Sequence, residues 1–282
     1  MKQFIIESEP DKDGLIRLDG KDYHYLVHVR RLAAGEYFPA LLPGNKETLV
    51  QVVSVSNGAL TGKCTAEAVC TAEEVCQNDI EKNSSDDIPP IILFQALPKN
   101  DKMDLIVRQA AEGGITEIVP FVSEFSTGKA DVGREKLSRW QRIIKEARQQ
   151  SGSRISTSLR PPVPLDQLID YWNKIKGNDA LGLLFHHLPE TPGSQPDEKS
   201  HFKGLENKCL HGYLCNKRKI VVLVIGPESG FSGAEVSLFL ENGFNAVTVG
   251  NTVLRTETAA LYCAAAVRIL LLEKDSWELR KK

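Results

Sequence analysis

The pattern of hydrophobic and polar residues divides the chain into two parts. From Phe4 to about residue 70, short stretches of strand-forming residues such as LVQVVSV (49–55) are separated by Asp-Gly, Pro-Gly and Asn-Gly pairs. Short strands joined by such turn signals are typical of an antiparallel β structure. This part of the sequence therefore predicts a small β barrel.

From Ile91 onward, apolar runs alternate with longer stretches that have helical periodicity. The runs predict strands at 91–97, 115–122, 180–185, 220–226 and 246–250. The periodic stretches predict helices at 102–112, 134–150, 233–242 and 258–272. Alternation of this kind predicts an α/β domain with a mostly parallel, buried sheet.

Two polar segments interrupt this organisation. Residues 71–90 are acidic, lack a steady period and end in a double proline, so we interpret residues 73–88 as a linker between domains at 1–72 and 89–282. Residues 187–218 carry Pro, Gly, Ser and charge without a helical stripe. They predict a surface insertion or long loop in the second domain.

Composition narrows the functional classes. A formal net charge of −2 excludes a generally basic nucleic-acid coat but allows local basic patches. The six cysteines match no zinc module, so we expect reduced thiols and no metal. No apolar run reaches the length of a membrane helix and the amino end lacks a signal-peptide pattern, so we expect a cytoplasmic protein without a membrane partner.

The densest chemical signal is VIGPESGFSGAEV (224–236), where a buried strand runs into a glycine turn and then a helix. Gly226 and Gly230 permit tight turns and close backbone approach, and Ser232 with Glu235 predicts a capping box. Ligands of α/β proteins bind at such strand ends. The alternative is an ordinary strand-to-helix turn.

A second signal is VTVGNTVLRTETAA (247–260), where a strand ends at Gly250 and a polar loop leads into an alanine-rich helix. Thr256 is a candidate helix cap, and Glu257 suits the positive end of the helix dipole, so capping alone could explain both. Arg255 opposes that dipole, which indicates an anionic partner. Arg255 is therefore the first candidate for function.

Together these segments resemble the RsmE family of the SPOUT class of RNA methyltransferases, whose members carry GPEGGF followed by Ser and Glu, and later LG, LR and TETA. The resemblance continues through LFQALPKNDKMDLIVRQAAEGGITEIVPFVSEFST, WQRIIKEARQQSGSR and HYLVHVRRLAAGEYF, which is nearly the whole chain. The departures include Ser229, where the family usually has a glycine, and Phe125, where a basic residue is common. Ser229 would perturb the turn if its backbone required a positive φ.

This resemblance implies an α/β fold with a SPOUT-type parallel sheet and a C-terminal trefoil knot, preceded by a PUA-like β barrel. It implies a homodimer that binds S-adenosylmethionine and methylates N3 of a uridine in small-subunit (16S) ribosomal RNA. Arg255 would stabilise charge on the uracil, Glu257 or a water would assist deprotonation, and no metal is required. The residues expected to bind the cofactor are Gly226, Pro227, Glu228, Gly230, Gly250, Val253, Leu254 and Thr258.

A basic region runs from Lys129 to Arg154, where eight Lys or Arg residues face three acids. An apolar stripe that includes Trp140 leaves the arginines on other helix faces, where they can meet phosphates or simply face solvent. The basic segment near His28 extends this surface into the barrel. The RNA-binding candidates are His28, Arg30, Arg31, Arg139, Arg142, Arg148 and Arg154.

Two other functions remain open from the sequence. One is a SPOUT methyltransferase that acts on another RNA position, and the other is a non-catalytic RNA-binding or ribosome-assembly protein of the same fold. A Rossmann dehydrogenase and a P-loop enzyme are disfavoured, because the sequence lacks both G-x-G-x-x-G after the first strand and G-K-S/T.

Overall fold

A computed structural model of the chain describes residues 4–56, 58–65, 88–127, 130–186, 209–250 and 252–273. The chain forms two compact units, one of Met1–Asn83 with Arg148–Arg154 and the other of Ser84–Ala147 with Ile155–Lys282. The boundary falls within the segment predicted as a linker, of which residues 73–87 lie outside the described residues.

The first unit contains a five-stranded sheet with the order β1-β3-β4-β5-β2. Neighbouring strands are antiparallel except for β1 and β3, which are parallel. The clearest predicted strand, LVQVVSV, lies within β4. The strands are β1 (Phe4–Ile5), β2 (Leu15–Asp19), β3 (Tyr37–Leu42), β4 (Lys46–Ser56) and β5 (Ala59–Thr65).

Three short helical segments complete this unit: α1 (Gly20–Tyr23), the π-helix His24–Val29 and the 3-10 helix Pro43–Asn45. The π-helix carries Leu26 into the core, where it packs with Phe38 and residues of the sheet. The outward-facing residues of the same segment, His28 among them, are left exposed.

The second unit contains a seven-stranded parallel sheet with the order β12-β10-β11-β6-β7-β8, and β9 also pairs with β7. This confirms the predicted α/β fold with a mostly parallel sheet. The strands are β6 (Ile91–Ala96), β7 (Glu117–Val122), β8 (Ser158–Leu159), β9 (Val163–Pro164), β10 (Ala180–Phe185), β11 (Ile220–Ile225) and β12 (Phe244–Val247).

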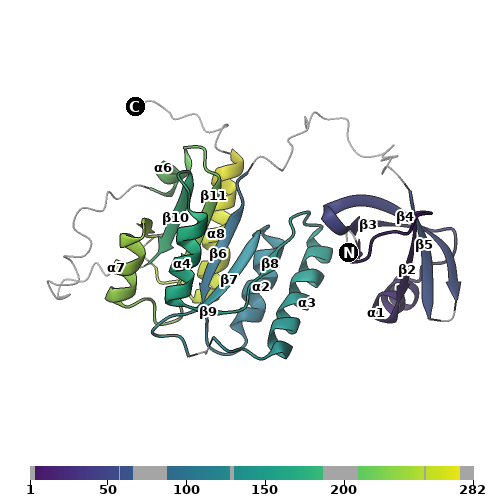
Figure 1. The fold of residues 1–282 in the computed structure, drawn as a ribbon, viewed down its shortest axis with the longest axis horizontal. Helices are drawn as coiled ribbons and strands as arrows, with labels where there is room; N and C mark the ends of the chain where they lie inside the picture. The colour runs from purple at the N-terminus through teal and green to yellow at the C-terminus, as the bar shows by residue number, and fades with distance from the viewer. Residues whose placement is uncertain are drawn as a thin grey trace. The chain divides into compact units, whose positions relative to one another are not determined.

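Helices cover both faces of this sheet (Figure 1). Because side chains alternate along a strand, Leu93 packs into the layer formed with α2, α3, α6 and α8, whereas Phe94 packs into the layer formed with α4 and α7. The helices are α2 (Lys102–Glu112), α3 (Arg134–Ser151), α4 (Leu165–Ile175), α6 (Leu210–Leu214), α7 (Gly233–Glu241) and α8 (Thr256–Glu273).

The structure differs from the predicted elements in several places, and the short strands β8 and β9 were not predicted. The last strand is Phe244–Val247 instead of 246–250, because its partner β10 ends at Phe185, opposite Val247. Helix α4 was not predicted, although Leu168 and Trp172 give it a buried apolar face. Helix α6 lies within the predicted insertion. It has five residues, of which two are buried, and this is too short for the sequence to show a helical hydrophobic period.

Residues 187–208 of that insertion lie outside the described residues. Across the parts of the chain that the structure describes, no helix is both long and apolar enough to cross a membrane.

Candidate active site

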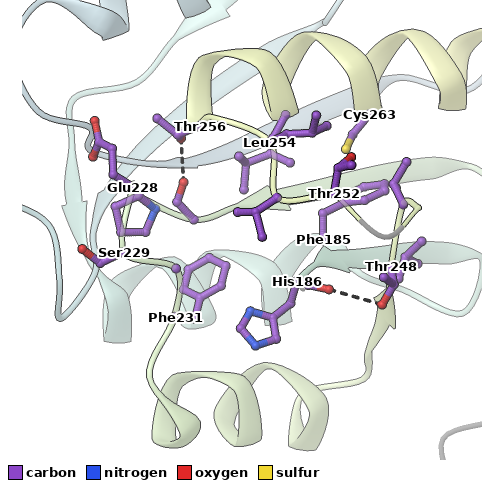
Figure 2. Close-up of a pocket in the computed structure, with 18 residues that line it drawn as sticks. Phe185, His186, Glu228, Ser229, Phe231, Thr248, Thr252, Leu254, Thr256 and Cys263 are labelled. Atoms are coloured by element: carbon purple, nitrogen blue, oxygen red, sulfur yellow. Dashed lines mark hydrogen bonds between the residues drawn. The ribbon is translucent and has the colours of Figure 1, made fainter. Parts of the chain in front are cut away.

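A cavity of about 260 Å³ lies at the carboxyl ends of β10, β11 and β12. It is bounded by the turn 226–231 after β11, by the loop after β12, and by the first two turns of α8 (Figure 2). The two glycine-bearing turns that the sequence singled out thus share one cavity. Their meeting follows from the topology, since parallel strands end at the same edge of the sheet.

The turn after β11 exposes its backbone to this cavity. A Cβ atom on Gly226 would lie 3.2 Å from the ring of Phe231, so a larger residue there would require a small shift of this ring. Gly230 has φ +73° and donates its N–H to the carbonyl of Pro227 at 3.0 Å. Ser229 is not among the described residues with a positive φ, so the substitution at 229 does not strain the turn.

The helix after this turn begins as predicted. Ser232 accepts from the N–H of Glu235, and the Glu235 carboxylate accepts from the N–H of Ser232, so the capping box is confirmed. The same carboxylate also accepts from the N–H of Glu124 at 2.9 Å and from the hydroxyl of Ser123 at 3.2 Å. Glu235 therefore joins the loop after β7 to the start of α7.

The prediction that Thr256 caps the helix is wrong. It is the first residue of α8, and its hydroxyl donates to the carbonyl of Gly226 at 2.6 Å and accepts from the amide of Gln95 at 3.0 Å. Gln95 is fully buried in β6. A polar residue inside an apolar strand was the sequence signal for this contact, which ties α8 to the turn after β11.

Arg255 precedes α8, and its carbonyl accepts from the N–H of Ala259. Its side chain is exposed and has no hydrogen bond or ion pair within the described residues. A guanidinium next to the positive end of a helix gains nothing from the dipole. It is therefore available to an anionic ligand. Arg255 does not itself line the cavity, but its neighbours Leu254 and Thr256 do.

Both acidic residues of the predicted site lie against Lys102. The ammonium of Lys102 is 2.8 Å from Oε1 of Glu228 and 3.4 Å from Oε2 of Glu257. Its hydrogen bond to Glu228 raises the pKa of Lys102 above the usual range. Burial pushes the pKa of Glu228 upward, but hydrogen bonds from Lys102 and from the backbone of Lys99 outweigh it and lower the pKa overall.

Of the residues expected to bind a cofactor, Gly250 and Thr258 do not line the cavity. The others do: Gly226, Pro227, Glu228, Gly230, Val253 and Leu254. Sequence reasoning missed the aromatic ring of Phe231, and it missed Phe185 and His186 at the end of β10. Cys263 also lines the cavity, and burial raises the pKa of its thiol to about 12, so it stays protonated.

The RNA-binding candidates of α3 are in different environments. Arg139 forms an ion pair with Asp104, and Arg142 lies 3.8 Å from Glu146 in an i,i+4 pair. Arg148 is only 8% exposed, so the prediction that it faces phosphates is wrong. The neighbouring residues Ala147 and Gln149 are buried as well, and burial lowers the pKa of the Arg148 guanidinium.

The remaining RNA-binding candidates, His28, Arg30, Arg31 and Arg154, are exposed. Lys129, which began the predicted basic region, lies outside the described residues. The cysteines that the structure describes are free, namely Cys64, Cys209, Cys215 and Cys263.

Comparison with known proteins gives consistent matches. Residues 86–268 match the family described as the RNA methyltransferase domain. The ribosomal RNA small subunit methyltransferase E 2 of Borreliella burgdorferi is 29% identical over 96% of this chain and 98% of its own. The ribosomal RNA small subunit methyltransferase E of Synechocystis sp. is 28% identical over 95% of this chain and 78% of its own.

Solved structures share the fold. The ribosomal RNA small subunit methyltransferase E of Neisseria gonorrhoeae, bound to S-adenosyl methionine, aligns with a TM-score of 0.73 at 22% identity over 96% of this chain and 98% of its own. A Legionella pneumophila structure in complex with bound cofactor SAM aligns with a TM-score of 0.71 at 25% identity over 95% of this chain and 97% of its own.

Proposed function

Since this chain belongs to the RNA methyltransferase domain family, we propose that it methylates ribosomal RNA with S-adenosylmethionine as the methyl donor. The resemblance to the RsmE family is confirmed by the family match and by relatives that cover 95% or more of the chain. The acceptor that we propose is N3 of a uridine in small-subunit (16S) ribosomal RNA. With this substrate, we place the protein in the cytoplasm.

The observation that carries the proposal is the shared cavity of the two glycine-bearing turns. The bare backbone at Gly226 and the left-handed turn at Gly230 leave room for a ligand to approach the main chain. We propose that the turn 226–230 and the loop 250–254 hold S-adenosylmethionine. The residues that would contact it are those of each segment that line the cavity, such as Gly226 and Gly230 in the turn and Val253 and Leu254 in the loop. When bound, this cofactor supplies an electrophilic methyl group.

The chain's own residues would position and activate the acceptor. Methylation of a uridine ring nitrogen needs a base outside its stack, loss of the N3 proton and an in-line approach to the methyl group. We assign to the exposed guanidinium of Arg255 the stabilisation of negative charge on the uracil carbonyls. Glu257, or a water beside it, would take the proton.

Nucleoside mass spectrometry of small-subunit ribosomal RNA tests this reaction. RNA from cells that lack the protein should be missing one 3-methyluridine, and purified enzyme with S-adenosylmethionine should restore it. Restoration of another methylated nucleoside would overturn the choice of acceptor and support a SPOUT enzyme for another position. If calorimetry detects no S-adenosylmethionine binding, the protein is instead a non-catalytic RNA-binding or ribosome-assembly protein.

The domain identities are part of the same proposal. We assign the first unit as a PUA-like barrel that binds RNA through His28, Arg30 and Arg31, and the second as a SPOUT methyltransferase domain with a C-terminal trefoil knot. Two features support the knot. The chain leaves β12 at one edge of the sheet, and α8, which follows the loop after β12, packs in the hydrophobic layer beside β6 and β11.

We also propose that two copies of the chain pair through α8. Leu261, Tyr262, Ile269 and Leu272 are between 41% and 54% exposed on this helix, and residues of α8 and α2 together line a second cavity of about 250 Å³. Apolar side chains at helical spacing favour a protein partner. Sedimentation equilibrium should give twice the chain mass, and Ile269→Glu should halve it; a monomeric wild type would contradict the pairing.

A further inference from the structure

Lys102 connects the two sides of the proposed active site although α2 itself contributes nothing to the cavity lining among the described residues. It is the first residue of α2, and its ammonium reaches Glu228 of the turn after β11 and Glu257 of the first turn of α8. The turn belongs to the proposed cofactor site. The helix start follows directly on Arg255.

The two carboxylates are shielded enough for this counterion to matter. The side chains of Glu228 and Glu257 are 22% and 13% exposed, and that of Lys102 is 30% exposed. Carboxylates that share a site repel each other more strongly where water is scarce. Lys102 is therefore placed to offset the repulsion between two segments that must stay together.

The hydrogen bonds of the two carboxylates are unequal. Glu228 also accepts a hydrogen bond from the backbone N–H of Lys99 at 3.1 Å. This bond to the segment before α2 remains when the side chain of Lys102 is removed. Oε2 of Glu257 is buried and has no hydrogen-bond partner within the described residues, which leaves the ion pair with Lys102 at that oxygen. The carboxylate of Glu257 thus depends on Lys102 more than that of Glu228 does.

We propose that Lys102 is a positioning residue for the transfer reaction, because its ammonium joins the cofactor turn to the helix start that follows Arg255 and so fixes the cofactor relative to the acceptor base. This inference rests on the proposed function. The raised pKa of Lys102 and the lowered pKa of Glu228 are consistent with a fully charged pair over the neutral pH range. Displacement of a positioned group by about 1 Å can slow a reaction by about 100-fold.

The test uses the full-length chain with Lys102→Met, which keeps the aliphatic length and removes the charge. We expect kcat for methylation of small-subunit ribosomal RNA to fall by about 10- to 100-fold, with the Kd for S-adenosylmethionine changed by less than about 5-fold. Lys102→Arg should recover most of kcat, because it restores the positive charge. Lys174→Met, on the exposed face of α4, is the matched control and should behave as wild type.

If Lys102 only stabilises the fold, the result should differ: Lys102→Met should lower Tm but leave kcat per folded molecule unchanged. That result, or a Lys102→Met kcat within about 2-fold of an active wild type, overturns the positioning role and leaves the proposed function intact. A wild type that neither binds S-adenosylmethionine nor methylates RNA overturns the proposed function itself. If Lys102→Met does not fold, Lys102→Gln, which keeps a hydrogen-bond donor, is judged by the same kcat criterion.

Discussion

Replacement of Arg255 by alanine is expected to lower the rate of methyl transfer by about 100- to 1000-fold, while S-adenosylmethionine still binds. The side chain of Arg255 is exposed and has no partner within the described residues, so its removal breaks no contact there. In the proposed mechanism, the replacement removes a positive charge that stabilises the negative charge on the uracil. Single-turnover methylation and calorimetric titration with S-adenosylmethionine measure the two quantities separately.

A matched control for this experiment is Arg108→Ala. Arg108 is also an exposed arginine of the methyltransferase unit, but it lies on α2, no described residue of which lines the cavity, whereas both sequence neighbours of Arg255 line it. Its replacement should leave turnover unchanged, which excludes a general effect of lost positive charge on RNA binding. Normal turnover by Arg255→Ala would refute the catalytic role of Arg255.

The largest loss of stability among single replacements near the site is expected for Glu235→Ala. The side chain is buried, and its carboxylate accepts hydrogen bonds from Ser123, Glu124 and Ser232. Alanine leaves these donors without their acceptor, and each unmet buried donor costs about 1–3 kcal/mol before relaxation. We expect the free energy of unfolding to fall by about 3 kcal/mol in total.

Urea unfolding followed by tryptophan fluorescence measures this loss in the methyltransferase unit, where the described tryptophans Trp140 and Trp172 are buried. Glu241→Ala is the control, because Glu241 is an exposed glutamate at the other end of α7. It should change the free energy of unfolding by less than about 0.5 kcal/mol. Equal effects of the two replacements would mean that the hydrogen bonds of Glu235 contribute little.

The features predicted well from sequence depend on nearby residues. Strand Ile220–Ile225 is a continuous apolar run, and its bounds agree with the prediction to within one residue. The capping box joins Ser232 and Glu235, which are three residues apart, so its residues are visible in one short segment. Local preferences and hydrophobic patterns are sufficient for such features.

The features that were mispredicted or missed depend on contacts between distant parts of the chain. Thr256 fits a cap by its local neighbours, but its hydroxyl is engaged by Gln95, 161 residues earlier in the sequence. Arg148 looks exposed on a helical wheel, yet it is buried where α3 ends. The ion pairs of Lys102 join α2 to two segments much later in the sequence, at Glu228 and Glu257.

The alternating side chains of β6 have a consequence for the site as well as for the core. Leu93 and Gln95 point to the side of α8, while Phe94 points to the side of α4 and α7. A slip of β6 by one residue against its neighbours would exchange these sides, bury the amide in the wrong layer and leave Thr256 without its donor. The apolar side chains that hold β6 in register therefore also keep Gln95 in place to donate to Thr256, which lines the cavity.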